Sequence, residues 1–135
     1  MTPRLFLDAN MLYVSLLRDL LLRLAVEGVC HVHWSAEVQG GWKQHLVDDA
    51  GYAEEVIART QARMDAALPT AQITGYEKLI PALQLPDPAD RHVLAAALQA
   101  QAEVLVTFNL KDFPPEVLAA HGLIPIHPDV LLPRL

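Results

Sequence analysis

Cysteine is nearly absent from this chain of 135 residues. Cys30 is the only one, so no disulfide can form within the chain. This excludes a small fold held together by disulfides, as well as a zinc site built from several thiolates. The lack of disulfides favours a protein of the reducing cytoplasm.

Long apolar runs are also lacking. The most apolar region, residues 11–26, is interrupted by Arg18, Asp19 and Arg23, whereas a membrane-spanning helix needs about 20 mostly apolar residues in a row. Strand-like sequence begins at Leu5, so the N-terminus does not resemble a signal peptide. We therefore expect no membrane segment.

Positive charge is scarce, with ten Lys and Arg against sixteen Asp and Glu and a net charge of −6. This balance argues against a protein that binds nucleic acid by charge alone. It does not exclude a phosphate substrate, because bound cations would offset part of the acidic charge. Hydrophobic residues make up 53% of the chain, which is enough for a folded core, and the length predicts a single domain over residues 1–135.

Two kinds of apolar segment alternate along the chain. Strand-like runs occupy residues 4–7, 32–34, 71–74, 104–108 and 123–126. Helix-like segments occupy residues 16–24 (with Gly28 as a stop), 35–47, 52–68, 88–101 and 115–121, while 79–85 is a short helix or loop and 128–135 a single turn or disordered tail. Alternating strands and helices predict an α/β fold with a central parallel sheet of four to five strands and right-handed crossovers.

Four aspartates lie at the ends of these segments. Asp8 follows the first strand, Asp87 and Asp90 open a helix, and Asp112 follows the strand at 104–108. Ligands of open α/β sheets bind beyond the carboxyl ends of the strands, so the four carboxylates are expected to converge there. Two like charges ~4 Å apart repel by about 4 kcal/mol at an effective dielectric of 20, which a divalent cation would relieve. Donor sets made of oxygen alone suit Mg²⁺ or Mn²⁺, and two such ions can activate water against a phosphodiester.

Each aspartate also has a simpler explanation. With Pro88 at the first helical position, Asp87 is a good N-cap and Asp90 occupies the position of the capping-box acid. Asp112 could be a turn residue and Asp8 a helix cap. Considered alone, capping is the better explanation for Asp87 and Asp90, whereas the four acids together favour a metal site.

Several segments together resemble a PIN domain, and within that family the bacterial VapC-like toxins. They are residues 7–10 (LDAN), 85–97 (LPDPADRHVLAAA) and 106–114 (VTFNLKDFP), with the helix start at 34–35 and the closing 127–129. The resemblance covers nearly the whole chain. It implies a three-layer α/β/α fold and a Mg²⁺- or Mn²⁺-dependent ribonuclease, often neutralised by an antitoxin encoded beside it. A homodimer is also implied.

The resemblance further implies roles for individual residues. The catalytic and metal-binding acids would be Asp8, Asp90 and Asp112, Asp87 would be an accessory metal-binding acid, and Asn10, Thr107 and Asn109 would support the site. His92 lies near these acids in the sequence, and we expect it only to pack beside them.

One position departs from the family pattern. Related sequences place a glutamate six residues after the serine that opens the second long helix, and counting from Ser35 leads to Gly41, preceded by Gly40. Glu37 lies one turn earlier on the same helix face and could partly substitute as a supporting acid. Because of Gly41, a PIN domain that no longer cleaves, and instead binds RNA or a partner protein, is the alternative to an active ribonuclease.

A third hypothesis makes Asp8 a phosphoacceptor, as in receiver or haloacid-dehalogenase-like domains. The segment from Asp8 to Asn10 lacks the second acid of the DxD motif that many such sites use. Lys111 follows Asn109 within a turn and does not have a strand end of its own. The sequence therefore favours the metal-dependent hypotheses.

Overall fold

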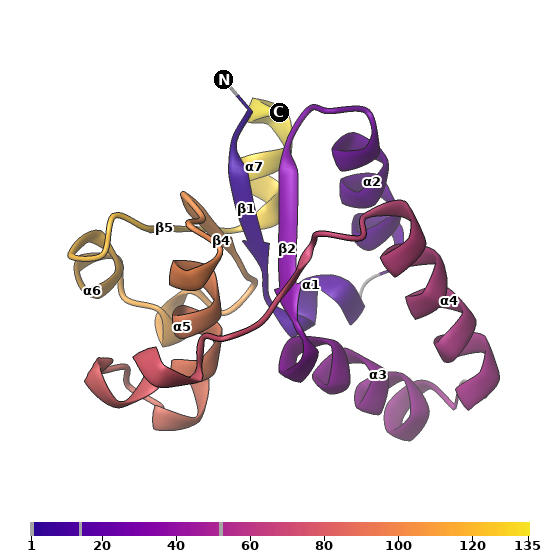
Figure 1. Cartoon of the computed structure of the whole chain (residues 1–135), viewed down its shortest axis with the longest axis horizontal. Coiled ribbons are helices and arrows are strands. Elements are labelled where there is room, and N and C mark those ends of the chain that lie inside the picture. The colour runs from indigo at the N-terminus through magenta and orange to yellow at the C-terminus, as the bar shows by residue number, and fades with distance from the viewer. Residues whose placement is uncertain (1, 14, 52) are drawn as a thin grey trace.

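The computed structural model describes residues 2–13, 15–51 and 53–135 (Figure 1). Its strands are β1 (Arg4–Leu7), β2 (His31–Ser35), β3 (Gln72–Ile73), β4 (Val104–Val106) and β5 (Ile124–Ile126). All four pairings between neighbouring strands are parallel, and the order across the sheet is β3-β2-β1-β4-β5. The predicted parallel α/β sheet is confirmed.

Helices cover both faces of this sheet. They are α1 (Ala9–Tyr13), α2 (Ser15–Val26), α3 (Ala36–Ala50), α4 (Glu54–Ala67), α5 (Arg91–Gln99), α6 (Pro115–Ala119) and α7 (Pro128–Leu131). Figure 1 shows α2 and α4 on one side of β1 and β2, and α5 and α6 on the other, which gives the predicted three layers. Among the residues described, no helix has the length and apolar character needed to cross a bilayer.

The central strand explains why the fold forms. Leu5, Phe6 and Leu7 of β1 are wholly buried, and β1 pairs with β2 on one side and β4 on the other. Strands of a parallel sheet are covered by helices on both faces, so they are apolar at consecutive positions. The other strands place their carboxyl ends beside that of β1, and these ends carry the candidate residues.

Some boundaries differ from the sequence prediction. Strand β4 ends at Val106, not at residue 108, because the chain turns at Thr107, whose Oγ1 accepts a hydrogen bond from the N–H of Asn109 at 3.0 Å. The helix predicted from Pro88 begins with a 3₁₀ turn over Pro88–Asp90 before α5. The C-terminal tail is helical in α7 and in a 3₁₀ turn over Leu132–Arg134. The predicted start at Tyr52 lies outside the described residues, and α4 begins at Glu54.

The serine predicted to cap the second long helix does so. Ser35 Oγ accepts a hydrogen bond from the N–H of Val38 at 3.1 Å, and Ser35 is wholly buried. We expect Ser35→Ala to lower the free energy of unfolding by about 1 kcal/mol, the usual loss for an N-cap. Urea denaturation measures this, with Thr70→Ala, at an exposed turn residue, as the control. Equal effects of the two substitutions would contradict the capping role.

Candidate functional site

Asp8 is held in place by hydrogen bonds to the residue that follows it and to the end of β4. Its N–H donates to the carbonyl of Val106 at 3.1 Å, which ties the end of β1 to β4. Its Oδ1 accepts from the N–H of Ala9 at 2.7 Å, and its Oδ2 accepts from Thr107 Oγ1 at 3.0 Å. The carboxylate therefore has a defined orientation at the carboxyl edge of the sheet.

The predicted supporting residues surround this carboxylate. Asn10 Nδ2 lies 3.4 Å from Asp8 Oδ2 and 3.3 Å from Thr107 Oγ1, and Asn10 Oδ1 accepts from the N–H of Phe108 at 3.4 Å. Thr107 is wholly buried. Asn109 takes part through its backbone N–H, which donates to Thr107 Oγ1. Two segments far apart in sequence, the start of α1 and the turn after β4, thus fix Asp8.

The acids influence one another electrostatically. Burial raises the pKa of Asp8, the hydrogen bonds from Ala9 and Thr107 and the charge of His92 oppose that rise, and Asp112 adds to it. The pKa of Asp90 is also raised, first by burial and then by the charges of Asp87, Asp112 and Asp8. The four aspartates predicted from the sequence therefore lie within one electrostatic neighbourhood.

The two aspartates at the start of α5 have different roles. Asp87 is exposed, and its Oδ1 accepts from the N–H of Ala89 at 2.9 Å, so the predicted N-cap is confirmed. Asp90 directly precedes α5, and its side chain makes no capping hydrogen bond to that helix. The carboxylate of Asp90 is therefore available to a ligand, whereas that of Asp87 has a structural use.

The donor set is chemically suited to a hard cation, but its spacing is wide. Carboxylate oxygens from Asp8, Asp90 and Asp112 are the ligands that Mg²⁺ and Mn²⁺ prefer. Within residues 2–13, 15–51 and 53–135, no group of three or more Asp, Glu, His or Cys side chains is placed closely enough to hold a metal ion. Binding would require these side chains to move together.

The family of the chain follows from comparison with known proteins. Residues 4–111 match the family model described as PIN domain. The chain belongs to the PIN domain family. A Mycobacterium tuberculosis protein named "Putative ribonuclease VapC50" is 48% identical over 65 residues. That alignment covers 48% of this chain and only 38% of the relative, so the predicted VapC-like character rests on part of each protein.

In this PIN domain the position of the missing glutamate faces the site. A Cβ atom added to Gly41 of α3 would lie 3.3 Å from the Cβ of Ala9, the residue after Asp8. A Cβ atom added to the neighbouring Gly40 would meet nothing within 4 Å. Gly41 therefore allows α3 to pack closely against the turn that carries Asp8, and it removes a carboxylate from that place.

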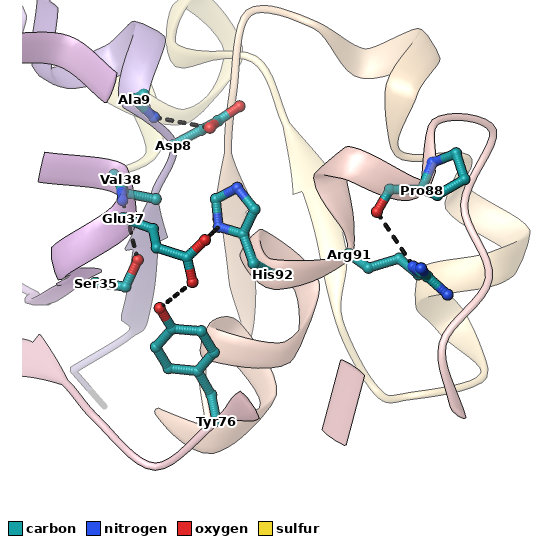
Figure 2. A network of polar contacts seen from close by, with 9 residues as sticks. All are labelled: Asp8, Ala9, Ser35, Glu37, Val38, Tyr76, Pro88, Arg91 and His92. Atoms are coloured by element: carbon teal, nitrogen blue, oxygen red, sulfur yellow. Dashed lines mark hydrogen bonds and ion pairs between the residues drawn. The ribbon is translucent and has the colours of Figure 1, made fainter. Parts of the chain in front are cut away.

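Glu37 does not simply replace the missing acid. Its Oε1 accepts a hydrogen bond from the hydroxyl of Tyr76 at 2.5 Å, and its Oε2 lies 3.7 Å from Nδ1 of His92 (Figure 2). Burial and then the bond to Glu37 raise the pKa of Tyr76 to about 12, so its hydroxyl stays a donor. The acid expected to support the site directly is thus held between a tyrosine and a histidine.

The sequence did not predict the contacts that Tyr76 and His92 make with Glu37. Tyr76 carries no motif, and it meets Glu37 only through the fold, 39 residues along the chain. His92 was expected only to pack beside the acids. The one available signal was its place two residues after Asp90, at the start of α5.

Proposed function

We propose that this PIN domain is a metal-dependent endoribonuclease of the VapC type, the toxin of a toxin–antitoxin pair, with activity reduced by the glycine at position 41. The observation that carries the proposal is the electrostatic convergence of Asp8, Asp90 and Asp112. These acids come from three separate segments. Burial raises the pKa of Asp8 and Asp90, and the charges of neighbouring acids raise it further. A fold that keeps ionisable groups in such a place commonly uses them.

Each residue would have its own role in the proposed site. Asp8, Asp90 and Asp112 would hold Mg²⁺ or Mn²⁺, with Asp87 at the margin. When bound, the metal supplies activation of water and stabilisation of charge on a phosphodiester. Thr107 and Asn10 hold the Asp8 carboxylate in one orientation, which is the usual task of residues behind a metal ligand.

RNA as the substrate is supported by the family and by similarity to a protein named as a ribonuclease. A cognate antitoxin and a homodimer belong to the same proposal, because they accompany the VapC-like character. The decisive experiment is RNA cleavage by the purified protein with Mn²⁺, with EDTA, and by an Asp90→Asn variant.

A second candidate is a PIN domain that binds RNA or a partner protein without cleaving it. Two observations favour it: the glycine at position 41, and the absence, within the described part of the chain, of three potential ligands close enough for a metal. Restoring a glutamate at position 41 separates the two candidates.

The proposal predicts that Mn²⁺ stabilises the protein in a pH-dependent way. The raised pKa values of Asp8 and Asp90 mean that the folded state binds protons more tightly than the unfolded chain. Below their ordinary pKa of 3.8, these groups therefore add to the free energy of unfolding of the metal-free protein. This contribution is lost as the pH rises through their raised pKa values. A cation relieves the repulsion between the ionised carboxylates. At 100 times its Kd it adds about 2.7 kcal/mol.

Thermal melting checks this expectation. We expect Mn²⁺ to raise Tm by several degrees at pH 7.5 and by less at pH 4.5, where protons compete for the same oxygens. Sodium chloride at matched ionic strength is the control for screening. An equal rise in Tm with sodium chloride, or a larger Mn²⁺ effect at pH 4.5, would count against a carboxylate site.

A further inference from the structure

The side chain of His92 has an unexplained environment. Its Nδ1 is buried and has no hydrogen-bond partner, although Glu37 Oε2 lies only 3.7 Å away. Buried nitrogens without partners are rare in folded proteins. The side chain is nevertheless 25% exposed, so part of the ring reaches the surface beside the acids.

Glu37 cannot turn away from His92 freely, because Tyr76 holds it. Tyr76 is only 3% exposed, so its ring is fixed in the core, and its hydroxyl donates to Glu37 Oε1. A hydrogen bond to a charged group is stronger than an ordinary one, so the carboxylate remains pointed at Tyr76. We call the pair Tyr76 and Glu37 the clamp.

The opposite side of the His92 ring faces the acidic cluster. Burial raises the pKa of both Asp8 and Asp90, and the charge of His92 lowers it in each case. An effect of His92 on both groups means that its ring lies near both carboxylates. Figure 2 shows the ring between the Glu37 carboxylate and Asp8, with its second nitrogen on the Asp8 side. The clamp therefore orients a nitrogen toward the place where a substrate would meet Asp8.

We propose that His92 contacts the phosphate of bound RNA, and that the clamp of Tyr76 and Glu37 is the positioning device that orients its ring. This inference rests on the proposed function and adds a substrate-contacting residue to it. Nδ1 of His92 faces Glu37 Oε2 at 3.7 Å. The second ring nitrogen is therefore the one that can donate to a phosphate oxygen. Glu37 thus acts through His92 and not as a substitute for the missing acid.

Nuclear magnetic resonance tests the clamp without any catalytic readout. In the ¹⁵N-labelled protein, Tyr76→Phe and Glu37→Gln are each expected to shift the ring nitrogen resonances of His92. Glu55→Gln, at an exposed acid of α4, is the matched control and should leave them unchanged. Unchanged His92 resonances in Tyr76→Phe and Glu37→Gln would overturn the clamp.

Binding of a non-cleavable RNA tests the phosphate contact. The probe is a fluorescent random-sequence dodecamer with 2′-O-methyl sugars, measured by anisotropy with Mg²⁺. We expect His92→Gln to weaken binding about tenfold, as for one lost charge-assisted hydrogen bond, and Tyr76→Phe roughly threefold. His121→Gln, at an exposed histidine, should bind like the parent.

The double variant distinguishes positioning from a merely structural role. If Tyr76 acts through His92, Tyr76→Phe adds no further loss in a His92→Gln background, whereas independent effects would multiply. Multiplying effects, or full affinity in His92→Gln, would overturn the proposal. If the parent itself binds no RNA, the proposed function and the phosphate contact fall together, and the resonance experiment still decides the clamp.

Discussion

Asp90→Asn is expected to abolish metal-dependent RNA cleavage while raising the stability of the metal-free protein. Burial and three neighbouring aspartates raise the pKa of Asp90, so its ionised form is unfavourable in the fold. Asparagine removes that charge, and no capping bond to α5 is lost because the Asp90 side chain makes none. Thermal melting in EDTA should therefore give a higher Tm for Asp90→Asn than for the parent.

The loss of RNA cleavage in Asp90→Asn should be large. Removing a residue behind a metal ligand commonly lowers affinity or activity 10- to 100-fold, so loss of a direct ligand should reduce cleavage by about 100-fold or more. The same substitution thus separates the function of Asp90 from its effect on stability. A merely structural acid would show the opposite pattern, with lower stability and unchanged cleavage.

Two measurements on one preparation decide this prediction. RNA cleavage is followed with Mn²⁺ and with EDTA, and thermal melting is followed in EDTA. Asp65→Asn, at an exposed aspartate of α4, is the control for removal of one negative charge. Cleavage that persists in Asp90→Asn, or that continues in EDTA, would rule out the proposed metal-dependent site.

The fold could be predicted because its strands are apolar at consecutive positions. Leu5, Phe6 and Leu7 read as one strand since β1 is covered on both faces, and the helices between strands forced parallel pairing. The end of β4 could not be predicted, because Thr107 is as strand-like as its neighbours. Its hydroxyl instead bonds Asp8 and the N–H of Asn109, which are contacts that only the folded chain provides.

Part of the arrangement of the acids could also be predicted. The convergence of Asp8, Asp90 and Asp112 was expected from the rule for strand ends, and their mutual effect on pKa values agrees with it. The contacts of Glu37 could not be predicted, because helix periodicity gives the face of α3 on which its carboxylate lies but not the residue that it contacts. Tyr76, from a segment between β3 and α5, decides where that carboxylate points.

Gly41→Glu is expected to increase Mn²⁺ affinity about tenfold and to increase RNA cleavage with it. Gly41 lies against Ala9, the residue after Asp8, so a side chain there begins beside the acidic cluster. One further carboxylate ligand worth about 1.4 kcal/mol gives the tenfold change. In the metal-free protein the same charge adds repulsion, so its stability should not rise by the full ~1 kcal/mol that replacing a helical glycine normally brings.

Two control variants separate the carboxylate from its side effects. Gly41→Ala adds only the Cβ that lies 3.3 Å from the Cβ of Ala9, so it measures the small shift that this contact requires. Gly40→Glu adds the same charge at an exposed position of α3 with open space around it. Calorimetric titration with Mn²⁺ and RNA cleavage are measured for all three variants and the parent.

The outcome decides between the two candidate functions. If only Gly41→Glu gains affinity and cleavage, the parent is a nuclease limited by one absent ligand, and its acids are otherwise competent. If Gly41→Glu binds Mn²⁺ no more tightly than Gly40→Glu, the glycine is not what limits the site. The wide spacing of Asp8, Asp90 and Asp112 is then a property of the native fold, and binding without cleavage becomes the better account of this PIN domain.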